Sequence, residues 1–215
     1  MAPDGDSHGG VTYWSATADL VTGAVVAGVG VACAARVRVG RDLPLAALPL
    51  LLGVHQIVEA AVWESHGGSE LATTVWAVIA LPLLAVWVPA GVLCVAPPRA
   101  RRRLVPLLVV GAGTAAMLAY GLVTGPVTAQ IRDRTIGYAF DLPHAPLLVA
   151  GYLPATVGSL LLAGDRRLVA LGGLVAVGAL GRWLLWRLEF VSTWCAVAAV
   201  CSVVLYRWVR ARHRA

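Results

Sequence analysis

The chain has 215 residues, of which 59% are hydrophobic and only 13% are charged, whereas soluble domains carry about 25% charged residues. A chain this apolar cannot bury its side chains in one small core, so we expect a multi-pass protein of the cell membrane, surrounded by membrane lipids. All 17 basic residues are arginine, and the absence of lysine excludes a Schiff-base cofactor and a P-loop. The net charge is +6, but the arginines form no basic stripe with interleaved aromatic residues, so we expect no nucleic-acid partner.

Residues 1–15 are polar and lack the positively charged segment of a secretory signal peptide, so we expect an uncleaved extracellular tail. Seven apolar runs follow, each close to the ~20 residues that a helix needs to cross a bilayer. They cover residues 16–35, 43–63, 71–93, 104–123, 145–163, 168–185 and 191–208. The sequence therefore predicts an all-α integral membrane bundle of seven transmembrane helices over residues 16–209, with a basic cytoplasmic tail at 210–215.

The arginines predict the orientation of these helices. Thirteen of them follow the odd-numbered runs, so they fall on one side of the membrane if the runs alternate in direction. They are Arg36, Arg38, Arg41, Arg99, Arg101, Arg102, Arg103, Arg166, Arg167, Arg207, Arg210, Arg212 and Arg214. Because positive charge is retained in the cytoplasm, we expect a cytoplasmic C-terminus and an extracellular N-terminus.

Small residues recur within the runs, for example at Gly23, Gly28 and Gly30. Helices in lipid associate by close backbone approach, which small residues permit. The four cysteines also lie within apolar runs and form no paired motif, so we expect them to pack as small residues rather than to bind metal. No other metal-binding motif occurs, and we expect neither a metal ion nor a cofactor.

Asp19 is the first acidic residue of the apolar part of the chain. It lies at the outer start of the first run, after Ser15 and Thr17. Such a residue is typical of a helix start, and it is also a candidate acid near the outer face.

The second run carries a carboxylate inside the predicted membrane. Glu59 has His55 at i−4, Gln56 at i−3 and Trp63 at i+4, so a helix places all four on one face. An ionisable residue within a membrane helix is costly and indicates a functional site. The alternative is an ion pair or hydrogen bond that only locks two helices together.

Residues 124–143 form a long segment between the fourth and fifth runs, on the outer side. Loops of this length are often lids or binding loops. The segment offers Tyr138 and Asp141, and His144 follows it directly. The stretch from Asp141 to His144 is either a second acid or base or merely the start of the next helix.

The sixth run carries Arg182, with Trp183 and Trp186 close behind it. Arg182 and Glu59 have similar predicted depths and are candidates for a pair, although Arg182 is equally suited to snorkel to the lipid headgroups. Most of the eight tryptophans, including Trp194, map to the outer half. This bias fits either an interfacial aromatic belt or an aromatic-walled pocket that stabilises a cation.

Segments from most of the chain resemble one family. SATADLVTGAVVAGVGV, LPLAALPLLLGVHQIVEAAVW, YAFDLPHAPLL and FVSTWCAVAAVCS are similar to small bacterial membrane proteins catalogued as a domain of unknown function. The positions that match are Glu59, Trp63, Asp141, His144, Trp194 and Cys195. Asp19 replaces a serine of the family pattern and His55 a glutamine, and this extra acid and imidazole indicate a specialised member.

The architecture is also similar, more loosely, to small membrane-bound terpene cyclases, which use carboxyl groups to protonate an isoprenoid double bond or epoxide. This second resemblance implies an enzyme that cyclises a prenylated lipophilic small molecule without a metal. Its catalytic candidates are Glu59, Asp141 and Asp19. Its substrate-binding candidates are His55, Gln56, Trp63, Tyr138, His144, Arg182, Trp183, Trp186 and Trp194. The alternative is a non-enzymatic protein that binds or transports a lipid or small amphiphile.

Overall fold

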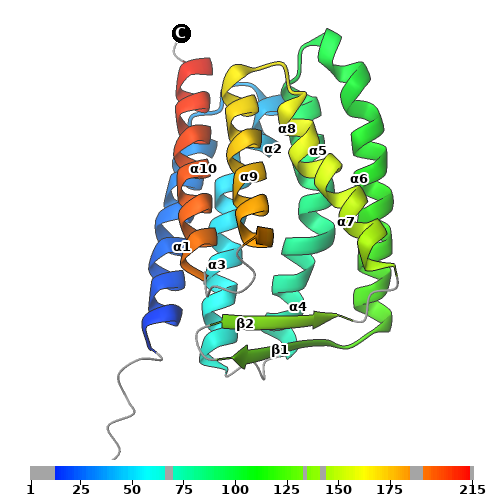
Figure 1. Ribbon diagram of the computed structural model, residues 1–215. Coiled ribbons are helices and arrows are strands. Elements are labelled where there is room, and N and C mark those ends of the chain that lie inside the picture. Colours follow the sequence, from blue (N-terminus) through cyan, green and yellow to red (C-terminus); the bar gives the residue numbers. More distant parts are fainter. Residues whose placement is uncertain (1–12, 66–69, 133–134, 141–143, 185–190, 214–215) are drawn as a thin grey trace, which may run out of the picture.

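The computed structural model is a bundle of helices that lie side by side, with a two-stranded hairpin across one end (Figure 1). It describes residues 13–65, 70–132, 135–140, 144–184 and 191–213. The first half contains α1 (Tyr13–Ala34), the 3₁₀ turn η1 (Gly40–Asp42), α2 (Leu43–Ala46), α3 (Leu48–Glu64), α4 (Glu70–Val78), the π-helical η2 (Ile79–Leu83), α5 (Leu84–Val95) and α6 (Pro98–Thr124). Strands β1 (Val127–Arg132) and β2 (Thr135–Phe140) follow, and then α7 (Ala145–Leu153), the π-helical η3 (Pro154–Gly158), α8 (Ser159–Leu161), α9 (Arg166–Leu184) and α10 (Val191–Arg212).

Four helical segments of the described chain are long and apolar enough to cross a membrane. They are Ala16–Ala34, Gly40–Glu64, Leu71–Val95 and Pro98–Thr124, and they coincide with the first four predicted runs. The fifth run contains a shorter apolar helix, Ala145–Leu161, and the last two runs form α9 and α10. The predicted helical bundle with helices of membrane-spanning length is confirmed, whereas seven crossings and the orientation of the termini stay predictions.

Proline marks two breaks in the long helices, and both are π-helical. Pro82 lies inside η2 and Pro154 begins η3. The regular hydrogen-bond pattern breaks at these residues because proline lacks an N–H and its ring displaces a carbonyl of the preceding turn. Hydroxyl groups bond to carbonyls near these breaks: Tyr152 donates to Ala80 O at 2.7 Å, and Thr156 donates to Tyr152 O at 2.8 Å. Such bonds let a broken helix persist in apolar surroundings, and the Tyr152 bond also joins α7 to η2.

Glycines bring α1 and α3 into close contact, as the small residues predict. A Cβ atom added to Gly23 would lie 2.9 Å from Gly53 O, and one added to Gly30 would collide with the backbone of Leu50. Side chains at these positions would therefore push the two helices apart. Gly28 differs, because nothing lies within 4 Å of its added Cβ atom, and it leaves an open surface on α1.

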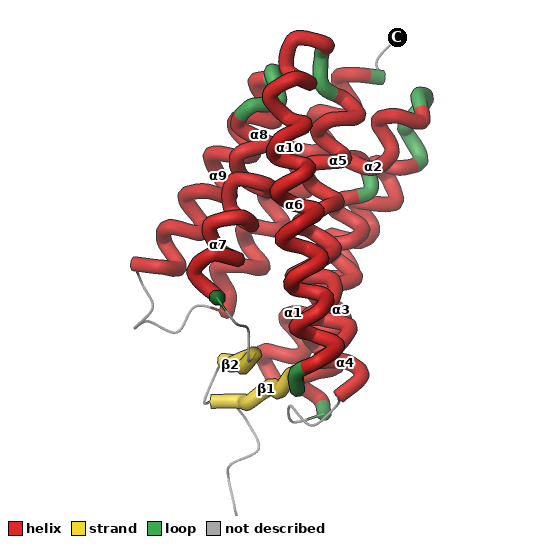
Figure 2. Tube along the Cα trace, turned by 90° about the vertical axis from the view of Figure 1, so that its right-hand side faces the viewer, coloured by secondary structure: helices red, strands yellow, loops and turns green. Residues whose placement is uncertain are grey.

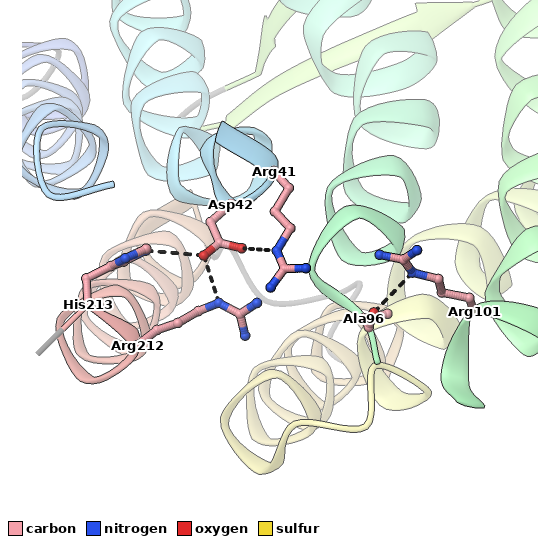
Figure 3. A network of polar contacts seen from close by, with 6 residues as sticks. All are labelled: Arg41, Asp42, Ala96, Arg101, Arg212 and His213. Atoms are coloured by element: carbon pink, nitrogen blue, oxygen red, sulfur yellow. Dashed lines mark hydrogen bonds and ion pairs between the residues drawn. The ribbon is translucent and has the colours of Figure 1, made fainter. Parts of the chain in front are cut away.

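The arginine-bearing helix ends gather at one end of the bundle, which we call the arginine-rich end. The ends of α1 and α10 and the starts of α6 and α9 all lie there, beside the C-terminus (Figure 1). The buried carboxylate of Asp42 on η1 contacts Arg212 Nε at 2.8 Å and His213 Nε2 at 3.2 Å, and Arg41 Nε lies 3.9 Å away (Figure 3). In the same region Arg101 donates to a backbone carbonyl (Figure 3). These contacts tie the end of α10 to the connection between α1 and α2.

The hairpin covers the opposite end, which we call the hairpin end (Figures 1 and 2). Its strands are antiparallel and pair Val127 with Phe140 and Ala129 with Tyr138. Their β-branched and aromatic residues favour strands, and exposure alternates along β2, where Ile136 and Tyr138 are half-buried and Gly137 is exposed. This hairpin within residues 124–143 was not predicted from the sequence. Strand β1 contacts α4, and β2 pairs with β1, so the hairpin brings Tyr138 of β2 to the bundle.

Candidate functional site

Polar and aromatic side chains from four elements meet at the hairpin end. We call them the hairpin-end cluster; they are Asp19 on α1, His55, Gln56, Glu59 and Trp63 on α3, Trp76 on α4 and Tyr138 on β2. The helical spacing of α3 supplies four of them on one face. The glycine contact between α1 and α3 brings Asp19 against that face, and the hairpin adds Tyr138.

Asp19 and Trp63 form a buried hydrogen bond within the cluster. The indole Nε1 of Trp63 donates to Asp19 Oδ2 at 3.0 Å. Asp19 is 1% exposed and Trp63 is 5% exposed. A buried carboxyl group is costly unless it is hydrogen-bonded, so this bond explains how α1 holds an acid inside the bundle. Because α1 begins at Tyr13, Asp19 lies inside the helix, and the expectation that it is a helix-start residue is wrong.

Three rings form a continuous aromatic wall beside these carboxyl groups. Trp76 and Tyr138 stack with their centroids 3.6 Å apart and their planes inclined by 8°. The ring of His55 lies 5.1 Å from Trp76 at an angle of 39°. The wall thus runs from α3 across α4 to the hairpin, and it joins a segment of the 124–143 loop to the membrane-length helices.

Tyr138 lies within the electrostatic reach of both carboxyl groups. Burial raises the pKa of its phenol well above the ordinary value, and the charges of Glu59 and Asp19 raise that pKa further. The phenol therefore remains protonated at any physiological pH. Glu59 itself is half-buried, one helical turn from both His55 and Trp63.

Several polar atoms of this region are buried without a hydrogen-bond partner among the described residues. They are His55 Nε2, Gln56 Oε1, Trp76 Nε1 and Thr73 Oγ1. His55 is 7% exposed and Gln56 is 3% exposed. Buried polar groups in folded proteins are nearly always hydrogen-bonded, so such a set of donors and acceptors is suited to a ligand that carries polar groups.

The remaining candidates fall outside the cluster or outside the described residues. His144 is exposed and precedes α7, where its carbonyl accepts from Leu147 N at 2.8 Å and its φ of 60° is left-handed. These contacts favour the helix-start interpretation. Asp141 and Trp186 lie outside the described residues, as do the side chains of Arg182, Trp183 and Trp194. The pairing of Arg182 with Glu59 therefore stays a prediction.

Thr73 and the central position of Trp76 were not predicted from the sequence. Their spacing of three residues on α4 places both on one helical face. That spacing was visible in the sequence, but nothing there indicated that this face meets His55 and Tyr138. No group of three or more metal-ligating side chains occurs in the part of the chain that the structure describes.

The structure combines helices long and apolar enough to cross a membrane with a buried acid–aromatic cluster next to a hairpin, which is compatible with a membrane protein. The chain belongs to a family of unknown function: the model described as "Family of unknown function (DUF6629)" matches residues 12–215. This confirms the resemblance to a domain of unknown function. No curated protein and no solved structure matches the chain.

Proposed function

We propose that this protein is a multi-pass protein of the cell membrane that cyclises a prenylated lipophile at the hairpin-end cluster, by protonating the substrate. The observation that carries the proposal is the buried Asp19–Trp63 pair, with Glu59 and Tyr138 beside it. A carboxyl group acts as an initiating acid while it carries its proton, and Asp19 and Glu59 bring two such groups to the cluster. The cluster therefore supplies an acid at a depth that a membrane-dissolved isoprenoid reaches.

The chemistry requires no redox partner. The carboxyl O–H bond breaks as its proton adds to a C=C bond of the substrate, whose π electrons form the new C–H bond. The resulting carbocation accepts the π electrons of a second double bond, and a C–C bond closes the ring. A neighbouring carbon then gives a proton back to a carboxylate or to His55, which restores an alkene, so the product is an isomer of the substrate.

The aromatic wall suits the intermediate of this reaction. Carbocations are stabilised by the negative faces of aromatic rings, and Trp76 stacked on Tyr138 offers such a surface next to the acids. The neutral phenol of Tyr138 cannot act as a nucleophilic phenolate that quenches the cation. Trp63 holds Asp19 in place.

A deuterium experiment tests the proposal. Membranes that contain the protein are incubated with farnesylated and geranylated acceptors in H₂O and in D₂O, with EDTA present throughout. We expect an isomer of unchanged mass in H₂O and the incorporation of one carbon-bound deuterium in D₂O, because the initiating proton comes from an exchangeable carboxyl group. A product without deuterium, or no isomer across the panel, would contradict the proposal.

One observation favours a second function, the binding of a lipid or small amphiphile without chemistry. The unpartnered polar atoms of His55, Gln56, Trp76 and Thr73 are suited to a polar headgroup. Passage to the other side has less support, because the arginine-rich end is filled by a buried apolar core that includes Leu45, Leu104, Leu168, Leu205 and Trp208. Substrates that raise the unfolding temperature but yield no isomer would favour this binding function.

A further inference from the structure

A groove runs along the outside of the bundle between α1 and α10. It has a volume of about 430 Å³ and is lined mainly by apolar residues, among them Val25, Val29 and Val203, with Arg36 and Tyr206 at one end. Gly28 forms part of the lining, and its missing side chain leaves the groove open. The groove shares no lining residue with the hairpin-end cluster and plays no part in the proposed chemistry.

A second pocket continues from this groove at the arginine-rich end. It has a volume of about 360 Å³ and shares Arg36 with the groove, and its other lining residues are Ala35, Arg38, Arg210 and His213. No carboxylate is among these described lining residues. The nearby Asp42 contacts Arg212 at 2.8 Å and the lining residue His213 at 3.2 Å, so the positive charge of the pocket comes from Arg36, Arg38 and Arg210. The pocket therefore concentrates positive charge where the apolar groove ends.

Arg36 is held in position at the junction. Its Nη1 donates to Ala32 O at 3.0 Å, and its Cζ lies 5.1 Å from the centroid of the Tyr206 ring. These two contacts orient the guanidinium while its other N–H groups remain suited to bidentate binding of a phosphate. An arginine fixed in this way loses little side-chain entropy when it binds an anion.

The dimensions fit a lipid. At 1.5 Å of rise per residue the α1 side of the groove, from Val25 to Ala32, is roughly 10 Å long, which lies within one leaflet of the ~30 Å hydrocarbon thickness of a bilayer. One acyl chain of a single leaflet has this reach. We propose that the groove and pocket bind one anionic glycerophospholipid, with its phosphodiester against Arg36, Arg38 and Arg210 and one acyl chain in the groove.

Native mass spectrometry of the full-length protein in detergent tests this site. The probes are phosphatidylglycerol, phosphatidylcholine with the same acyl chains, and glycerol 3-phosphate. We expect phosphatidylglycerol to bind with much higher affinity than the other two probes. The variant Arg36→Gln/Arg210→Gln should lower the affinity for phosphatidylglycerol on the order of 25-fold, because each arginine near an anionic headgroup raises the affinity about fivefold.

Two matched controls separate the site from general effects. Arg102→Gln/Arg103→Gln removes the same charge from exposed positions of α6 at the same end, and it should leave binding within about twofold. Gly28→Leu fills the groove and should weaken phosphatidylglycerol binding, whereas Gly113→Leu, at an equally open position on α6, should not. If the Arg36 variant fails to fold, Arg210→Gln alone, at an exposed position, should still weaken binding about fivefold.

Three results would overturn the proposal. Equal binding of phosphatidylcholine would show that charge plays no part, and equal binding of glycerol 3-phosphate would indicate a site for a free phosphate rather than a lipid. A loss in the α6 control variant as large as that in the Arg36→Gln/Arg210→Gln variant would show that only the net charge of this end matters.

Discussion

Asp19 and Trp63 are 44 positions apart, yet the indole of one donates to the carboxyl group of the other deep inside the bundle. Neither residue alone indicates this bond, because each has an ordinary role at a membrane interface. Once α1 and α3 pack closely, however, the carboxyl group loses water and needs a donor. This hydrogen bond therefore links the candidate acid Asp19 to the stability of the packing between α1 and α3.

Removing that donor should destabilise the protein. Trp63→Phe retains a ring but takes away the N–H, and we expect a loss of about 1–3 kcal/mol in the free energy of unfolding. A double-mutant cycle with Asp19→Asn, measured by chemical unfolding in detergent, isolates the bond from the change in ring size. Strictly additive losses would contradict the contact.

Tyr138 gives a second prediction, on pH. Its pKa is higher in the folded protein than in the unfolded chain, so the unfolded chain loses the proton first. The stability that this phenol contributes is complete below pH ~10, the usual tyrosine value. Above that pH it should fall by about 1.4 kcal/mol per pH unit until the folded pKa is reached.

Thermal unfolding between pH 8 and 12 measures this effect in the wild type and in Tyr138→Phe. The absence of lysine from the chain removes the commonest titration of this range. We expect the stability of the variant to fall less steeply above pH 10. Parallel pH profiles would show that Tyr138 is not buried next to the carboxyl groups.

At the scale of the elements, the contact between α1 and α3 positions the site. Gly53 lies so close to the backbone of Ala27 that an added Cβ atom would collide with it. The same contact sets the distance between Asp19 on α1 and the functional face of α3. One methyl group added at this contact is therefore enough to disturb the packing of α1 against α3.

Gly53→Ala should therefore reduce stability by about 1–3 kcal/mol, as overpacking does. Gly113→Ala is the matched control, since nothing lies within 4 Å of its added Cβ atom, and in a helix this change should be neutral or stabilising by up to ~1 kcal/mol. The free energies of unfolding in detergent are compared. Equal effects of the two substitutions would show that α1 and α3 are not in close contact.

The helices could be predicted from the sequence more completely than the candidate site. Apolar runs near 20 residues reveal membrane-length helices because the bilayer imposes that length, and the i−4, i−3 and i+4 spacing around Glu59 follows from helical geometry. The partners from other elements do not follow from any local period. Trp76 and Tyr138 meet only because the hairpin folds against α4, and its short strands of mixed polarity are a weak signal in a chain dominated by apolar runs.

At the scale of the whole molecule, the two ends of the bundle differ in chemistry. The described arginines at the ends of α1 and α10 and at the starts of α6 and α9 lie at one end, and the hairpin-end cluster of carboxyl groups and aromatic rings lies at the other. This polarity is the basis for the proposed orientation, with the arginine-rich end in the cytoplasm and the hairpin end outside.

Cysteine labelling in intact cells tests that orientation. A membrane-impermeant maleimide should label Thr128→Cys on the exposed side of β1 and should label Arg102→Cys on α6 only after the cells are opened. Cys33, Cys94 and Cys201 are buried or half-buried, and the wild type serves as the background. Labelling of both variants from outside would contradict the alternating topology.

The most direct test of the proposed cyclase compares the turnover of variants that each lose one carboxyl group. Glu59→Gln and Asp19→Asn preserve the shape of each side chain but remove its acidic proton, and Glu64→Gln changes an exposed carboxyl group of the same helix. Membranes with each variant are assayed for conversion of a prenylated acceptor to its cyclised isomer. We predict a loss of at least 100-fold for Glu59→Gln or Asp19→Asn, since general acid catalysis contributes about 10²–10⁴-fold, and wild-type turnover for Glu64→Gln. Wild-type turnover in both Glu59→Gln and Asp19→Asn would contradict the assignment of the acid to this cluster.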